Sequence, residues 1–330
     1  MADIDPPALE PDAAENFTDD SDGDSALGVS VKDALTSLRS SVLAYQKENG
    51  RTYHALSSGK YVLPNDEPEK ERLDLVHYIW TLTTDGKSVL CPKDEKAKRV
   101  LDVGTGTGIW AIEFADLHPE AEVIGVDLSP IQPTFVPPNC SFECDDVEKD
   151  WTWSTPFDLI YARAMIASFS DWEGFIQKAY DNLEPGGYLE LHDHSFPIRC
   201  DDDTMPDGTP ILKWAKLLIE ATDKISRPCA VAHKFKDMME AVGFVDVQEK
   251  VFKWPTNPWP KDKRAKELGM WAEAASLAGV EAMTLALFTR VLGWKPEETA
   301  VFSAQVRNDM RNRNIHGYWA VYTVYGRKPE

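Results

Sequence analysis

The chain has 330 residues, of which 43% are hydrophobic and 27% charged, a composition that suits a globular protein with a sizeable core. Acidic residues outnumber basic ones by 55 to 35, and the resulting formal net charge of −20 argues against nucleic acid and anionic membranes as partners. No apolar run approaches the roughly eighteen residues of a membrane span, and the N-terminal stretch lacks the basic start and apolar segment of a signal peptide.

The chain begins with an acidic stretch that is poor in large apolar residues. Residues 1–30 cannot bury enough apolar surface to offset the entropy lost on ordering, so we predict a disordered acidic tail. The spacing of apolar residues then predicts an amphipathic helix over 31–47. A turn is expected around Pro64 to Pro68, followed by a second helix over about 69–82.

From residue 99 onward, short apolar strands alternate with helices. The strands are predicted over 99–103, 121–126, 141–143, 157–161 and 187–191, and the helices over 109–117 and 172–183. Short, continuously apolar strands that are separated by helices are typical of a parallel sheet covered on both faces. We therefore predict an α/β, Rossmann-like fold.

The rhythm changes after Asp193. Helices are predicted over 211–225 and 233–242, a strand over 244–254, a long helical region over 262–312 and a last strand over 315–329. These additions make the expected sheet seven-stranded and mostly parallel, with helical cap insertions. We predict one domain over 31–330, made of an N-terminal helical segment (31–98), a cofactor-binding core (99–193) and a cap that includes the last two strands (194–330).

The most informative segment is RVLDVGTGTGIWAIEFA, in which a buried strand runs into a helix through Gly104, Gly106 and Gly108. Glycines at such a turn let the backbone approach a ligand without a Cβ clash, and the helix N-terminus beyond favours a carboxylate or phosphate. A dinucleotide fingerprint would place a third glycine where Ile109 stands, which argues against a nicotinamide-dependent oxidoreductase. Asp102 would repel a pyrophosphate and suits a cationic group such as the amine of a methionyl moiety.

Charged residues also follow the next three strands. Asp127 ends the second strand, where a carboxylate can accept hydrogen bonds from both hydroxyls of a ribose. Asp145 and Asp146 follow the third strand, where an acid can accept from the exocyclic amine of adenine with Val147 against the ring. Arg163 follows the fourth strand at the same edge. Each acid alone also fits an ordinary structural role, but together with the glycine turn they favour an adenosyl ligand at the carboxyl edge of the sheet.

This order of motifs resembles the class I S-adenosylmethionine-dependent methyltransferases, and NLEPGGYLELHD is similar to their turn into the fifth strand. RTYHALSSGKYVLPNDEPEKERLDLVHYIW, RAMIASFSDW and HGYWAVYTVYGRKP are similar to the fungal LaeA-like methyltransferases, over about residues 40 to 330. The resemblance implies S-adenosylmethionine as the cofactor. The residues expected to bind it are Asp102, Gly104, Thr105, Gly106, Gly108, Asp127, Leu128, Asp145, Asp146, Val147 and Arg163, with Tyr53 closing over the site.

The resemblance further implies methyl transfer to O or N of a small secondary metabolite in a filamentous fungus. It leaves open a nuclear regulator of secondary-metabolite genes that acts through protein partners. The N-terminal tail carries no basic localisation run, which favours a cytoplasmic enzyme.

Methyl transfer depends mainly on alignment in a dry pocket and requires a base only if the acceptor must lose a proton. The base candidates are His192 and Asp193, with His194 beside them. No metal is expected, because alternate strand residues face opposite sides, no third ligand is evident, and the five cysteines, interpreted as reduced thiols, complete no zinc site. The late insertion, which includes Trp254 and Trp271, fits either an apolar acceptor pocket or an ordinary helical core.

Overall fold

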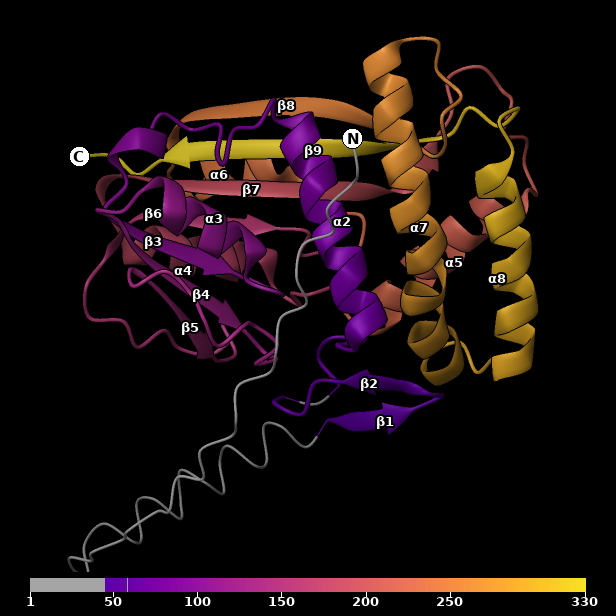
Figure 1. The fold of residues 1–330 in the computed structure, drawn as a ribbon, viewed down its shortest axis with the longest axis horizontal. Coiled ribbons are helices and arrows are strands. Elements are labelled where there is room, and N and C mark those ends of the chain that lie inside the picture. Colours follow the sequence, from indigo (N-terminus) through magenta and orange to yellow (C-terminus); the bar gives the residue numbers. More distant parts are fainter. Residues whose placement is uncertain (1–44, 58) are drawn as a thin grey trace, which may run out of the picture. The chain divides into compact units, whose positions relative to one another are not determined.

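The fold is built on one sheet with the strand order β5-β4-β3-β6-β7-β9-β8 (Figure 1). It is seen in a computed structural model that describes residues 45–57 and 59–330. Strands β3 to β7 pair in parallel, and β9 runs antiparallel between β7 and β8. The predicted seven-stranded, mostly parallel sheet is confirmed. The strands are β3 (Arg99–Val103), β4 (Glu122–Asp127), β5 (Cys140–Cys144), β6 (Phe157–Arg163), β7 (Leu183–Arg199), β8 (Val245–Pro255) and β9 (Tyr318–Arg327).

Helices cover both faces of the sheet, as the buried strands require. On one face α3 (Ile109–Leu117) packs Trp110 and Phe114 against β3, β4 and β6. On the other face lie α4 (Trp172–Asn182) and α6 (Phe235–Val242), whose apolar side chains share a core with the sheet. Asp171 caps α4 by accepting a hydrogen bond from the backbone N–H of Gly174.

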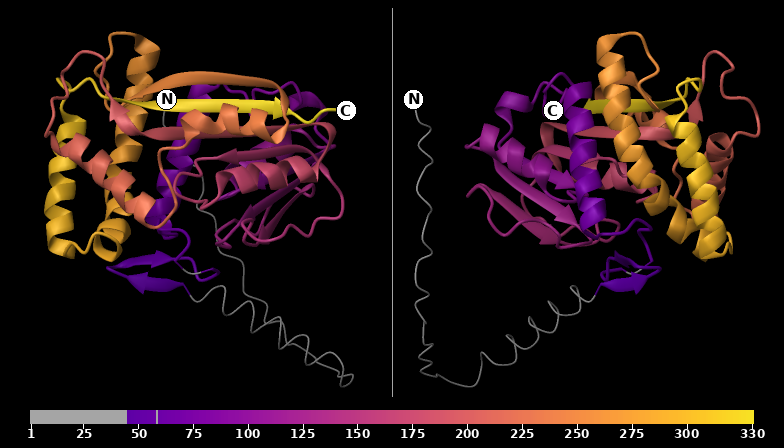
Figure 2. Two further views of the ribbon diagram at one scale, coloured as in Figure 1. Left: turned by 180° about the vertical axis from the view of Figure 1, so that it is seen from behind. Right: turned by 45° about the vertical axis from the view of Figure 1, so that its right-hand side comes forward.

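A second group of helices forms a cap at one end of the long strands (Figures 1 and 2). Its members are α2 (Glu67–Thr83), α5 (Pro210–Lys224), α7 (Lys263–Arg290) and α8 (Pro296–Arg311). They enclose a core of their own with Trp80, Trp214 and Phe288, and β7, β8 and β9 contribute side chains to it. The short 3-10 helices η1 (Asp94–Lys96) and η2 (Ala232–Lys234) join other elements. No helix among the described residues is both long and apolar enough to cross a membrane.

The helix predicted over residues 31–47 is wrong at its C-terminal end, the only part of it that the structure describes. Residues 46–48 form β1 (Gln46–Glu48), which pairs with β2 (Arg51–Tyr53) in a hairpin. Asn49 and Gly50 join the two strands with φ of +49° and +80°, and an Asn-Gly pair is a strong hairpin signal. Residues 1–44, with the predicted acidic tail and most of the predicted helix, lie outside the described part of the chain.

Two other boundaries differ from prediction. The expected helical region over 262–312 is divided into α7 and α8, because Gly293 has φ of +72° and Pro296 starts a new helix. The fifth strand runs from Leu183 to Arg199 rather than over 187–191, because β9 pairs with its later residues. The sheet therefore extends directly into the cap.

Candidate functional site

The turn between β3 and α3 requires glycine. Gly104, Gly106 and Gly108 have φ of +70°, +58° and +81°, a region that L side chains rarely adopt. Space is also short, because a Cβ on Gly108 would lie 2.4 Å from Phe142 Cζ. The N–H of Gly104 donates to the carbonyl oxygen of Val126 at 2.9 Å, which holds this bare backbone loop against the end of β4.

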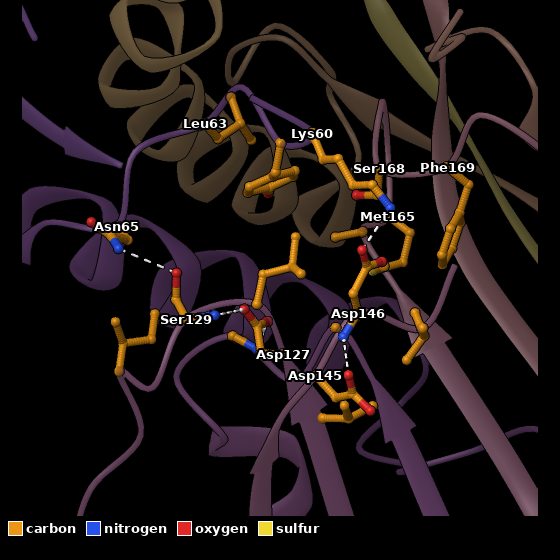
Figure 3. A pocket seen from close by; sticks show the side chains of 18 of the residues that line it. Lys60, Leu63, Asn65, Asp127, Ser129, Asp145, Asp146, Met165, Ser168 and Phe169 are labelled. Carbon is orange, nitrogen blue, oxygen red and sulfur yellow. Dashed lines mark hydrogen bonds and ion pairs between the residues drawn. The ribbon is translucent and has the colours of Figure 1, made fainter. Parts of the chain in front are cut away.

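A cavity with an empty volume of about 910 Å³ opens beside this loop, and we call it the edge cavity (Figure 3). The carboxyl ends of β3, β4, β5 and β6 all reach it, as expected for ligand sites of parallel sheets. Of the predicted binding residues, its lining includes Gly104, Gly106, Asp127, Leu128, Asp145, Asp146, Val147 and Arg163. The structure therefore brings together at one cavity residues that lie far apart in the sequence.

Asp127 joins the glycine loop to the end of β4. Its carboxylate accepts hydrogen bonds from the backbone N–H groups of Gly106 and Ser129, each at 2.9 Å (Figure 3). Burial raises the pKa of Asp127, and these hydrogen bonds oppose the rise. An ionised carboxylate offers about four acceptor directions, so capacity remains on the side that faces the cavity.

The two acids after β5 have different surroundings. Asp146 is almost fully buried and accepts hydrogen bonds at Oδ2 from Ser57 Oγ (2.7 Å) and Lys60 Nζ (2.6 Å). Burial raises the pKa of Asp146, but the hydrogen bonds from Lys60 and Ser57 outweigh it, and the net shift is downward. Asp145 is exposed, and its Oδ1 accepts from the N–H of Asp146 at 2.7 Å. Its Oδ2 has no partner among the described residues.

The chain between β2 and α2 closes part of the edge cavity, and we call residues 59–65 the strap. His54 holds it, with Nε2 lying 3.0 Å from the carbonyl oxygen of Tyr61. At its other end Asn65 Oδ1 accepts from Thr52 Oγ1 at 2.8 Å, and Asn65 Nδ2 donates to Ser129 Oγ at 3.2 Å. Lys60, Tyr61 and Asn65 consequently lie in the cavity wall.

A comparison with protein families decides the identity of the fold and its chemistry. A family model described as a methyltransferase domain matches residues 75–249. The chain belongs to this methyltransferase family. The strand order and the glycine loop after β3 are those of the class I methyltransferase fold, as the sequence predicted.

Relatives extend the match over most of this methyltransferase. Methyltransferase pytC of Aspergillus terreus is 41% identical over 297 residues, which is 90% of this chain and 92% of that protein. The secondary metabolism regulator LAE1 of Cochliobolus heterostrophus is 39% identical over 86% of this chain and 94% of that one. The protein-methionine methyltransferase laeA of Emericella nidulans is 36% identical, over 86% and 77% respectively. The predicted membership of the LaeA-like methyltransferases is confirmed.

Several predicted site residues of the methyltransferase do not line the edge cavity. Asp102 lies behind the loop, where its Oδ2 accepts from Thr105 Oγ1 at 2.6 Å, and burial raises its pKa to about 6. Gly108 is the N-cap of α3. Tyr53 is buried beneath the guanidinium of Arg290, whose Cζ lies 4.5 Å from the ring centroid. These residues support the loop and the hairpin rather than the cavity wall.

His192 belongs to a buried network on β7, outside the edge cavity. Its Nε2 lies 2.6 Å from Glu190 Oε1, and the carboxylate of Glu190 also accepts from the backbone N–H groups of Leu90 and Cys91, both at 2.7 Å. Neither side chain lines the edge cavity. The network ties the segment after α2 to the centre of the sheet.

Arg163 connects the edge cavity to α2. Its Nη2 donates to His77 Nδ1 at 2.8 Å, and His77 Nε2 lies 2.8 Å from Glu113 Oε2. Burial and the neighbouring charge of Arg163 lower the pKa of His77. A neutral His77 with its proton on Nε2 satisfies both contacts, and it fixes the guanidinium at the rim of the cavity.

A second cavity, the cap cavity, lies beside the first, with an empty volume of about 660 Å³. Tyr61, Leu63, Leu73 and Ala164 line both cavities, so the two spaces share a wall. Ala164 has φ of +56°, and its N–H donates to the carbonyl oxygen of His192 at 2.9 Å. At this turn after β6, Ala164 lines both cavities.

Most other residues of the cavity wall could not be predicted from the sequence. Lys60 reaches Asp146 from 86 residues away, and neither belongs to a local motif that requires the other. Met165, Ser168 and Phe169 follow β6 in a loop without periodicity. The position of this loop after the fourth strand was the one available indication, since ligands bind at carboxyl ends of strands.

Proposed function

We propose that this methyltransferase moves a methyl group from S-adenosylmethionine, bound in the edge cavity, to a small-molecule acceptor in the cap cavity. The observation that supports this most is the edge cavity itself, where the glycine loop, Asp127 and Asp145 line one space at the carboxyl ends of adjacent strands. The shared wall of the two cavities gives the acceptor a place directly beside the donor.

The lining residues fit the parts of the cofactor. The bare backbone at Gly104 and Gly106, with Arg163 at the rim, suits the methionyl portion and its carboxylate. Asp127 has acceptor capacity left for the ribose hydroxyls. Asp145 is the acceptor for the adenine amine, since Asp146 is already occupied by Lys60 and Ser57 and serves to hold the strap.

The bound cofactor supplies an electrophilic methyl group on a sulfonium. The chain contributes alignment and exclusion of water, because Tyr61, Leu63 and Leu73 line both cavities with mostly apolar surface. Neither a nucleophilic side chain nor a metal has to take part in such a displacement. Most of the acceleration then comes from positioning.

The experiment combines binding and turnover. Calorimetry with S-adenosylhomocysteine tests the edge cavity, and incubation of the pure protein with labelled S-adenosylmethionine and a fungal metabolite extract tests transfer. We expect micromolar binding and a labelled small product. A folded protein that takes up neither molecule would refute the cofactor assignment.

A second candidate is a regulatory role, because relatives 39% and 36% identical are named a secondary metabolism regulator and a protein-methionine methyltransferase. In that case the acceptor is a methionine side chain of a protein, and the site of action is the nucleus rather than the cytoplasm. The same labelling experiment separates the two, since label would then enter protein, and small products would be missing. The net charge of −20 supports neither role through direct binding of nucleic acid.

A further inference from the structure

The wall of the cap cavity is mostly apolar. Helices α2 and α7 and strands β8 and β9 supply its apolar side chains, among them Val76, Ile79, Met283, Trp254 and Trp319. Two indoles in one wall favour a flat, aromatic occupant over a flexible or highly polar one. The apolar lining alone would accept any such molecule.

One permanent cation lies in this wall. Arg72 donates from Nε and Nη2 to the carboxylate of Glu69, at 2.9 and 2.6 Å. Glu69 is 2% exposed and does not line the cavity, whereas Arg72 does, so the positive end of the pair faces the space. Nη1 of Arg72 has no acceptor among the described residues. Burial lowers the pKa of Arg72, but Glu69 outweighs this and keeps the guanidinium charged.

One neutral donor, His194, lines the cap cavity with Arg72. Burial, reinforced by the charge of Arg72, lowers the pKa of His194 to about 4, and burial raises the pKa of Asp193 to about 8. Both groups are therefore uncharged near pH 7, and Asp193 Oδ1 accepts a hydrogen bond from the backbone N–H of His194 at 2.8 Å. A neutral imidazole carries one N–H, and no described residue forms a hydrogen bond with either ring nitrogen of His194, so this N–H is available to a ligand in the cap cavity.

The remaining wall carries no competing charge. Tyr61 is the other ionisable residue in the described lining, and burial raises its pKa well above neutrality. Helix α7 contributes Ala272, Ala275 and Ser276 there, besides Met283. The cation of Arg72, the neutral donors of His194 and Tyr61, and apolar side chains thus surround the cap cavity, and no carboxylate lines it among the described residues.

We infer that the cap cavity binds the acceptor as an oxyanion, so that the substrate class is a flat, apolar phenol or enol, with its oxygen between Arg72 and His194. This rests on the proposed function for the position of the donor. The hydroxyl proton is released to solvent as the acceptor binds. A lone pair of the oxyanion then forms the bond to the methyl carbon, the carbon–sulfur bond breaks with its electron pair left on sulfur, and the two opposite charges disappear together. An ammonium group in the same place would be repelled by Arg72 and find no counter-ion.

The test uses three probes of one shape: 7-hydroxycoumarin, 7-methoxycoumarin and 7-aminocoumarin, added to the full chain saturated with S-adenosylhomocysteine. Fluorescence titration gives each dissociation constant, and the excitation spectrum of the hydroxy probe reports its ionised fraction against pH. At pH 7.5 we expect the hydroxy probe to bind at least tenfold more tightly than the other two. Its titration midpoint should fall by about one pH unit or more on binding.

The decisive variant is the double substitution Glu69→Gln with Arg72→Gln, which removes the pair without leaving a buried charge alone. This double variant should abolish both the tighter binding of the hydroxy probe and the fall of its titration midpoint. The matched control is Glu67→Gln with Lys70→Gln, an ion pair at the same helical spacing on the outer side of α2. The variant His194→Gln is a second check, and it should weaken the preference without loss of the fold.

Equal binding of the three probes, or a shift that survives in the double variant, would overturn the inference. Calorimetry with S-adenosylhomocysteine is read separately on the same samples. If S-adenosylhomocysteine binds normally but the three probes bind equally, the proposed acceptor class is refuted and the cofactor site stands. If S-adenosylhomocysteine does not bind but the preference for the hydroxy probe remains, the cofactor assignment is refuted and the acceptor class stands.

Discussion

Replacing Asp127 by alanine tests the central contact of the edge cavity. Two hydrogen bonds at 2.9 Å from Gly106 and Ser129 are lost, but the variant also relieves the cost of a buried charge. We therefore expect a modest loss of stability, about 1–2 kcal/mol. Loss of the acceptor for the ribose hydroxyls should cost a further ~1.5–3 kcal/mol of binding, or about a tenfold to hundredfold increase in the dissociation constant for S-adenosylhomocysteine.

A ligand without the 2′ and 3′ hydroxyls separates recognition of the ribose from support of the loop. Calorimetry or competition with adenosine and 2′,3′-dideoxyadenosine should show a strong preference for adenosine in the native protein and nearly none in Asp127→Ala. Glu122→Ala is the control, because Glu122 starts the same strand at the end remote from the cavity and is exposed. If the variant still discriminates between the two ligands as the native protein does, Asp127 only fixes the loop, and the ribose assignment fails.

Three further outcomes follow from the geometry. Gly108→Ala should lower the free energy of unfolding in urea by about 2 kcal/mol or more, because a Cβ would overlap Phe142. The control Gly86→Ala, at φ +78° with nothing within 4 Å of the added Cβ, should cost only about 1 kcal/mol. Equal losses in the two variants would contradict the predicted overlap. Asp102 binds its proton more tightly in the folded state, so the stability that it contributes falls as pH rises from about 4 to about 6. The free energy of unfolding of Asp102→Asn should equal that of the native protein near pH 4 and exceed it by about 2–3 kcal/mol at pH 7. A difference that does not change with pH would exclude the raised pKa. Glu190→Gln should lower the free energy of unfolding by about 2–4 kcal/mol, because the amide NH₂ then faces a backbone N–H donor. Binding of S-adenosylhomocysteine, measured by calorimetry, should not change. Weaker binding would show that this network takes a direct part in cofactor binding.

The elements that could be predicted are those that local pattern determines. β3 and α3 begin and end at the predicted residues, because an apolar strand, three glycines and an apolar helix follow one another without a gap. Asp127 was predictable for the same reason, since it ends a buried strand. Each inference needed only residues that are neighbours in the sequence.

What could not be predicted depends on contacts between distant segments. Arg72 stands on a predicted helix, where it also fits an ordinary surface ion pair, and only the packing of α2 on α7 places it in the cap cavity. His192, Asp193 and His194 adjoin in the sequence, which does not show that His192 contacts Glu190 while His194, on the same face of β7 and two residues further along, lines the cap cavity. The wrong helix at residues 46–47 was avoidable, because the Asn49–Gly50 turn signal stands in the sequence.

The length of β7, β8 and β9 has a consequence for how such enzymes diversify. These strands contribute at one end to the core under α4 and α6, and at the other to the core enclosed by α2, α5, α7 and α8. Substitutions in the helices at the far end can therefore reshape the chamber that admits a new substrate while the hydrogen-bonded ladder preserves the machinery at the near end. Descendants of one ancestral gene can in this way acquire different substrates and still share a single methyl source.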